Sequence, residues 1–177
     1  KRLALTVMDW APWDELYDFA QNPADRKFER DNLSDDAMRN LRVDGVMILD
    51  PAYKICYSRL LLAGGAEKDP LRFEADWERL LAASPDLQER LQQGECIKGL
   101  AILGNQPAFV AVQQILHSDK RGPGAGFLVM LQLVDAELLQ EFSQMLQASL
   151  FLEQEPALHA KYGPATRVWS DNTDSRL

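Results

Sequence analysis

The sequence predicts an α+β domain, in which a long N-terminal helix and further helices pack beside a five-stranded antiparallel sheet. Three observations support this fold class. Residues 1–21 carry apolar side chains at helical spacing, residues 43–61 read as a hairpin, and residues 97–134 contain three more strands separated by short turns. Strands joined by short turns pair antiparallel, and we expect the helices on one side of the sheet.

The first helix, residues 1–21, has two apolar faces. One carries Trp10, Trp13, Tyr17 and Ala20, and the other carries Leu5, Met8, Pro12, Leu16 and Phe19. A helix that is apolar on two sides usually packs on its own domain and on another subunit, so we expect homodimerisation through this helix. Pro12 removes one backbone hydrogen bond and should kink the helix or start a new one.

The hairpin at residues 43–61 is the clearest strand pair. Residues 43–50, VDGVMILD, are apolar on both faces, as in a buried central strand. The return strand, within residues 53–61, alternates with a period of two: four larger side chains are separated by polar or small ones. These four are Tyr53, Ile55, Tyr57 and Arg59.

The remaining elements complete one domain over residues 1–150. A helical excursion is expected at residues 62–96, where Phe73, Trp77 and Leu80 recur at helical spacing, and a helix capped by Asp135 at 135–150. Residues 151–177 form a weakly patterned C-terminal segment.

Length, composition and net charge exclude several classes of function. The 177 residues suit one domain, and the net charge of −8 argues against nucleic-acid partners and against a basic membrane-docking face. No apolar run approaches the roughly 18–20 residues of a membrane span, and no signal peptide is visible. Because the chain begins without Met while the amphipathic pattern is already running, we interpret it as a piece of a longer protein.

Signatures of catalysis and metal binding are missing from the sequence. It contains no GxGxxG, P-loop, GxSxG, HExxH or CxxC motif, and neither His117 nor His159 has a ligand at i±3 or i±4. We therefore expect no enzyme activity, no cofactor and no metal. Cys56 and Cys96 can pair in an oxidising compartment or both remain buried thiols.

Several polar and aromatic residues are candidates for a ligand site. Asp9 can cap the turn at Pro12 or hold a ligand's cation, and the aromatic face can be core or a ligand cage. Gln113 and Gln114 interrupt an apolar run, so one of them faces inward and needs a partner, which a bound molecule can supply. The candidate ligand-binding residues are Tyr57, Gln113, Phe127, Asp50 and Trp77.

Two stretches carry a family resemblance. DWAPWDELYDF, then Asn32-Leu33, then LRVDGVMILDP resembles the fourth class of the CHASE sensor domains, and GLAILGNQPAFVAVQQIL, GPGAG and FLVMLQLVD fit its second half. The matching motif positions are Asp9, Ala11, Trp13, Asp14, Tyr17, Asn32, Asp44 and Asp50. Two departures are Pro12 within the first motif and Pro51-Ala52-Tyr53 in place of the usual Asp-x-x-Gly turn.

The resemblance implies a PAS- or Cache-like sensor domain on the periplasmic side of the bacterial inner membrane, anchored by helices outside this sequence. It implies an unknown small-molecule ligand and a cytoplasmic cyclic-di-GMP synthase or phosphodiesterase in the same chain. Asp9, Trp13, Asp14, Tyr17 and Asn32 are then mainly structural, holding the first helix to the sheet. The alternative is a module of the same fold that dimerises or binds a protein without a ligand.

Overall fold

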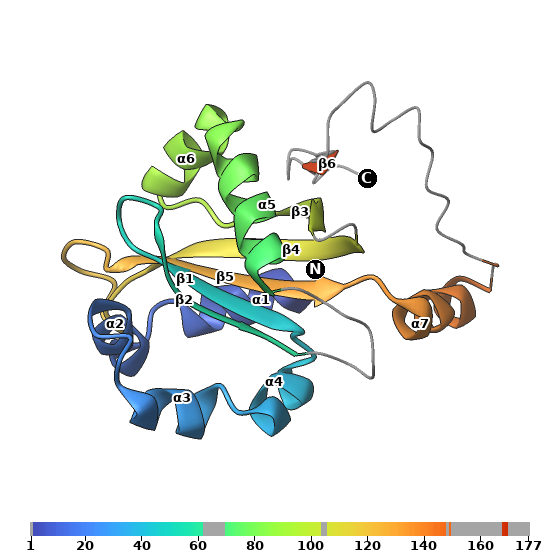
Figure 1. Cartoon of the computed structure of the whole chain (residues 1–177), viewed down its shortest axis with the longest axis horizontal. Coiled ribbons are helices and arrows are strands. Elements are labelled where there is room, and N and C mark those ends of the chain that lie inside the picture. Colours follow the sequence, from blue (N-terminus) through green and yellow to red (C-terminus); the bar gives the residue numbers. More distant parts are fainter. Residues whose placement is uncertain (1, 62–69, 104–105, 148, 150–167, 170–177) are drawn as a thin grey trace.

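The computed structural model describes residues 2–61, 70–103, 106–147, 149 and 168–169, and Figure 1 shows an antiparallel sheet with helices around it. Six strands form the sheet in the order β2-β1-β5-β4-β3-β6. They are β1 (Gly45–Leu49), β2 (Ile55–Leu60), β3 (Ile97–Leu103), β4 (Gln106–Ile115), β5 (Gly126–Leu133) and β6 (Val168–Trp169). The predicted α+β class and antiparallel sheet are confirmed, and the two-residue β6 extends the edge at β3.

Seven helices surround this sheet among the described residues, and none of them is both long and apolar enough to cross a membrane. They are α1 (Arg2–Trp10), α2 (Asp14–Gln21), α3 (Arg26–Asn32), α4 (Asp35–Leu41), α5 (Pro70–Ala82), α6 (Pro85–Gln92) and α7 (Ala136–Leu146). Residues 62–69 of the predicted excursion 62–96 lie outside the described residues, as does all of the C-terminal segment 151–177 except 168–169.

The long N-terminal helix was a wrong prediction, because the chain forms two short helices separated at Pro12. The Ala11 amide still bonds the Val7 carbonyl, but the Ala11 carbonyl accepts a hydrogen bond from Leu116 at 3.1 Å. Pro12 pairs with Leu116 in a parallel bridge. Proline has no N–H to continue the helix and disfavours a helical Ala11, so the break docks this linker on the end of β4.

Helices cover both faces of the sheet, which corrects the expectation that they lie on one side. The first face packs α1 to α4 against Val46 and Ile48, and the second packs α5 and α6 against Met47 and Leu49. In Figure 1, α1 lies behind the sheet and α5 lies in front of it. Since β1 is buried along its whole length between β2 and β5, both sides of it need an apolar cover.

A β-bulge at Cys56 redistributes the residues of β2 between the two faces. Ile48 pairs with Tyr57 and Leu49 pairs with Ile55, so Cys56 is left over between them. Beyond the bulge Tyr57 packs on the first face, whereas Tyr53 and Ile55 pack on the second. The period of two that links them in sequence therefore does not put them on one side.

The two cysteines are free thiols, so no disulfide joins them. Burial is the main cause that raises the pKa of each thiol, and the Asp50 carboxylate raises that of Cys56 further. The Cys56 thiol donates to the Ile48 carbonyl at 3.2 Å and so supports the bulge.

Candidate functional site

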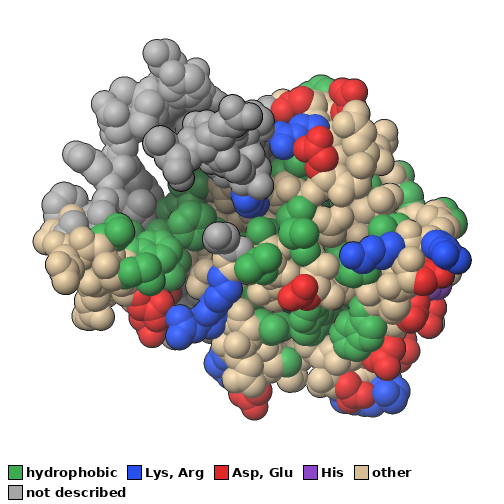
Figure 2. Space-filling view, turned by 180° about the vertical axis from the view of Figure 1, so that it is seen from behind, with side chains coloured by type: hydrophobic (Ala, Val, Ile, Leu, Met, Phe, Trp, Pro, Cys, Tyr) green, Lys and Arg blue, Asp and Glu red, His purple; other side chains and the backbone are tan. Residues whose placement is uncertain are grey.

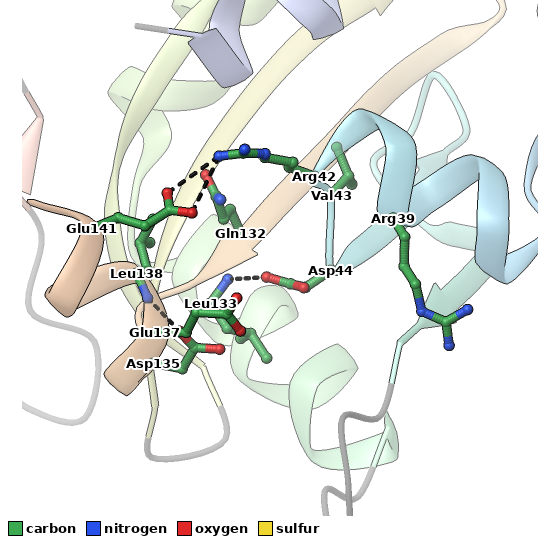
Figure 3. Close-up of a pocket in the computed structure, with 10 residues that line it drawn as sticks. All are labelled: Arg39, Arg42, Val43, Asp44, Gln132, Leu133, Asp135, Glu137, Leu138 and Glu141. Atoms are coloured by element: carbon green, nitrogen blue, oxygen red, sulfur yellow. Dashed lines mark hydrogen bonds and ion pairs between the residues drawn. The ribbon is translucent and has the colours of Figure 1, made fainter.

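A cavity of about 370 Å³ opens between the α4–β1 connection and the β5–α7 connection. Ten residues line it: Arg39, Arg42, Val43, Asp44, Gln132, Leu133, Asp135, Glu137, Leu138 and Glu141 (Figure 3). Small-molecule sites are commonly clefts of roughly 300–1,000 Å³ with a few convergent polar groups. The sequence prediction did not find this cavity, because its walls come from four elements that are distant along the chain.

Local backbone structure places two of the lining carboxylates. Asp44 precedes β1, where its side chain accepts a hydrogen bond from the Leu133 amide at 2.8 Å. Asp135 is the N-cap of α7, and its side chain accepts from the Leu138 amide at 2.8 Å. An N-cap aspartate satisfies an otherwise unpaired helix amide, so these bonds fix the ends of β1, β5 and α7 around the cavity.

An exposed ion pair spans one side of the cavity. Arg42 caps the C-terminus of α4 in the left-handed conformation, with φ 54°, and its guanidinium lies 3.2 Å from the Glu141 carboxylate of α7. The two side chains are 55% and 45% exposed, so the pair contributes only about 0–1 kcal/mol. A ligand group of the right charge can replace either partner at small cost.

Arg39 contributes little to the interior of the cavity. Its side chain points away from the other lining residues in Figure 3, and it pairs with Asp35 and Asp36 of its own helix. Arg42 is therefore the guanidinium that faces the lining carboxylates. Among the described residues, no cluster of three or more His, Cys, Asp or Glu is arranged to hold a metal ion.

Tyr57 and Gln113, the leading sequence candidates for ligand contact, make contacts within the protein. The Tyr57 ring lies 5.1 Å from that of Phe19, and its hydroxyl donates to Glu29 at 3.3 Å. Burial first, and the Glu29 charge second, raise the pKa of Tyr57 to about 12. The Gln113 amide donates to the Gly94 carbonyl at 3.2 Å.

The other three candidates lie elsewhere. Phe127 stacks on Tyr53 at 4.8 Å and Trp77 is fully buried, both on the second face of the sheet. Asp50 closes the β1–β2 turn by accepting from the amides of Ala52 and Lys54. The structure therefore does not bring the five candidates into one site, and a ligand role for each of them stays a prediction.

The motif residues of the first two helices gather around α2 and the turn after β4. Asp14 accepts from the Ser118 amide at 3.1 Å and lies 2.8 Å from Nδ1 of His117. The Tyr17 ring stacks on the His117 ring at 3.7 Å, and its hydroxyl donates to the Pro123 carbonyl at 3.1 Å. These contacts attach α2 to the sheet.

The remaining motif residues have weaker attachments. Trp13 packs edge-on against Trp10 at 5.4 Å and beside Phe28 at 5.4 Å. Asn32 is the half-buried last residue of α3. Asp9 is exposed, and its carboxylate has no hydrogen-bond partner among the described residues, so it does not cap the turn at Pro12.

A second charged group, missed by the sequence prediction, ties β2 to α3 and α4. Arg59 bridges Glu29 at 3.2 Å and Asp35 at 2.8 Å. Hydrogen bonding to Arg26 is the main cause that lowers the pKa of Glu29, and hydrogen bonding to Arg59 lowers that of Asp35. The alternating pattern of β2 places Arg59 two residues after Tyr57, on the same side of the strand. Nothing in the sequence indicated that Glu29 and Asp35 would be the partners of Arg59.

Comparison with known families assigns the chain to a class. Residues 1–153 match a family of sensor domains from signalling proteins, which are sensory and not catalytic. The matching model is that of the CHASE4 domain, and because it covers most of the chain, the chain belongs to the CHASE4 family. CHASE domains are in general extracellular. A search of curated proteins finds no match.

Proposed function

We propose that this domain is the periplasmic ligand-sensing part of a membrane-anchored bacterial receptor, and that the cavity between α4–β1 and β5–α7 holds the ligand. The observation that carries the proposal is a cavity of about 370 Å³ with charged walls in a member of a sensor family. The ligand would bind one of two arrangements of α7 more tightly than the other, and so would shift the equilibrium between them. The resemblance to CHASE receptors supports a cyclic-di-GMP synthase or phosphodiesterase as the output in the same chain.

A steric variant tests the ligand site whatever the ligand's chemistry. Gln132 lines the cavity from β5 and is half-exposed, so Gln132→Trp fills the cavity without burying a charge. In a thermal-shift screen against cationic, anionic and neutral metabolites, a ligand raises the melting temperature of the native chain by mass action. We expect Gln132→Trp to abolish that rise, whereas Gln140→Trp, on the exposed side of α7, should keep it.

A hit whose shift survives Gln132→Trp would place the ligand elsewhere and refute the cavity as the site. The output is tested separately, in membranes that contain the parent receptor. Addition of the ligand should change the rate of cyclic-di-GMP synthesis or hydrolysis there. An unchanged rate with a ligand that binds the domain would refute the proposed output.

The second candidate function is an interaction module that dimerises through α1. Leu5 is 53% exposed and Met8 is 48% exposed, and α1 lies on the near side in Figure 2, where hydrophobic side chains are visible among charged ones. The other half of the expected dimer stripe, Leu16 and Phe19, is buried in the domain's own core. Any α1 interface is therefore smaller than the sequence predicted.

Analytical ultracentrifugation decides this candidate. We expect a dimer at high concentration that Leu5→Glu with Met8→Glu converts to a monomer. A strict monomer of the native chain at every concentration tested would exclude dimerisation by this domain alone.

A further inference from the structure

We propose that the cavity binds a small organic cation, a compound with a primary amine or guanidinium group, and that this cation fixes the position of α7. The inference rests on the proposed function, since it names the ligand class for the same cavity. Three features of the molecule support it: the charge lining the cavity, two acceptor groups with no partner among the described residues, and the low burial of α7.

The charge lining the cavity is predominantly negative. Four carboxylates line it, those of Asp44, Asp135, Glu137 and Glu141, against the guanidinium groups of Arg39 and Arg42. Arg39 is committed to Asp35 and Asp36 and points away, which leaves Arg42 alone on the cavity side. An anionic ligand would meet this excess of carboxylates at close range, whereas a cation would relieve it.

Two acceptor groups in the cavity are unused. The Glu137 carboxylate and the Gln132 amide have no hydrogen bond or ion pair among the described residues. Glu137 lies in the first turn of α7, and Glu141 follows four residues later on the same side of that helix. An ammonium group offers three donors and a guanidinium offers five, which suits a wall of oxygen acceptors.

The Arg42–Glu141 pair shows that the cavity already accommodates a guanidinium at this wall. The Arg42 group reaches across from α4 and lies 3.2 Å from Glu141 (Figure 3). A ligand cation would take the place of Arg42 at Glu141 and add a contact to Glu137. Because both acids belong to α7, the ligand would hold that helix against β1 and β5.

Helix α7 buries little of its surface among the described residues. Leu138 is its buried residue, Phe142 meets Phe109 edge-on at 6.1 Å, and Arg42 pairs with Glu141. Met145 is 76% exposed and Leu146 is 63% exposed, so the second half of the helix has little packing. An element with few buried contacts is the one that a ligand can shift most easily.

Agmatine, which carries both an amine and a guanidinium group, is the probe, with glutarate as the anion and xylitol as the neutral compound. Binding to the intact chain is measured by calorimetry in 150 mM salt, which screens the general attraction of a cation to a chain of net charge −8. We expect agmatine to bind and glutarate and xylitol not to bind.

Charge variants give the sharper test. Glu137→Gln and Glu141→Gln should each weaken agmatine binding about tenfold or more, since each removes a charge-assisted contact. Glu78→Gln, an exposed acid of α5, removes the same charge at a distant place and should leave affinity unchanged. Arg42→Ala should leave binding equal or tighter, because Arg42 competes for Glu141.

The outcomes separate this inference from the proposed function. If glutarate or xylitol binds, and Gln132→Trp stops it, the cavity is a ligand site but the cation class is wrong. If agmatine binds equally to the native chain and to both glutamine variants, its site is elsewhere and the inference fails. If no compound of any class is affected by Gln132→Trp, the inference and the proposed function both fail.

Discussion

Nδ1 of His117, in the turn after β4, lies 2.8 Å from the Asp14 carboxylate of α2. The same carboxylate accepts from the Ser118 amide, and the Tyr17 ring stacks on the imidazole at 3.7 Å. Asp14 and Tyr17 of the N-terminal motif therefore attach α2 to the sheet, and the proposed ligand cavity lies at the opposite end of β1.

The contacts of Asp14 should make the stability of the fold sensitive to low pH. Hydrogen bonds from Ser118, and then the contact with His117, lower the pKa of Asp14 from 3.8. A carboxyl whose pKa is lower in the folded state stabilises the fold above its unfolded pKa, and this stability is lost as pH falls through the folded value. We expect the melting temperature of the native chain to fall below pH 3.8 more steeply than that of Asp14→Asn.

Asp18→Asn is the matched control, because Asp18 is exposed on the same helix. It should keep the pH profile of the native chain. Parallel profiles for the native chain and Asp14→Asn would show that the contact does not stabilise the fold.

Tyr57 should make the stability of the fold sensitive to high pH. Its pKa is raised to about 12, so the neutral hydroxyl is favoured in the folded state. The corresponding stability is complete below the unfolded value of 10.0 and is lost as pH rises toward 12. We expect Tyr57→Phe to lose about 1 kcal/mol at pH 7 through the missing Glu29 bond, and to show a smaller loss above pH 10 than the native chain.

Absorbance at the phenolate band measures this titration directly. Burial also raises the pKa of Tyr53, so both Tyr53 and Tyr57 should ionise late in the native chain, and Tyr57→Phe should lack the phase near pH 12. A native chain whose tyrosines all ionise near pH 10, while still folded, contradicts the buried position of the hydroxyl.

Gly126, the first residue of β5, is predicted to be harder to replace than Gly122 in the preceding turn. Its φ is 134°, and an added Cβ would lie 1.9 Å from the Leu49 carbonyl oxygen. Gly126→Ala should therefore cost about 2 kcal/mol or more, from backbone strain together with displacement of β1. Gly122 is the control, because its φ is also positive, 84°, but the space around its Cβ position is open. Gly122→Ala therefore measures backbone strain alone and should lower the free energy of unfolding by about 1 kcal/mol.

Urea denaturation of both glycine variants gives the free energies of unfolding. Equal losses would mean that the approach of Gly126 to Leu49 has no energetic consequence.

Much of the sheet could be predicted from the sequence, because each strand carries its own pattern. The fully apolar β1 stretch indicated a central strand, and the same pattern also required cover on both faces, which the expectation of helices on one side overlooked. Pro12 correctly predicted a break, although not that Ala11 would bond Leu116 across 105 positions of sequence. Resemblance to a family added what local patterns lack, namely the assignment to CHASE4 sensors.

The ligand site could not be predicted in the same way. The bulge at Cys56 separates Tyr57 from Tyr53, and nothing in the local sequence marks a bulge there. The cavity joins the end of α4 to the start of α7, which meet only because β1 pairs with β5. A surface assembled by such distant pairing leaves no spacing pattern in the sequence.

Amide hydrogen exchange across Ala136–Leu146, with and without agmatine, tests the central claim that a ligand in this cavity holds α7. We expect slower exchange of α7 in the native chain at saturating agmatine, and no change in Gln132→Trp. Exchange of α7 that agmatine leaves unchanged in the native chain, or slows equally in both proteins, would contradict it.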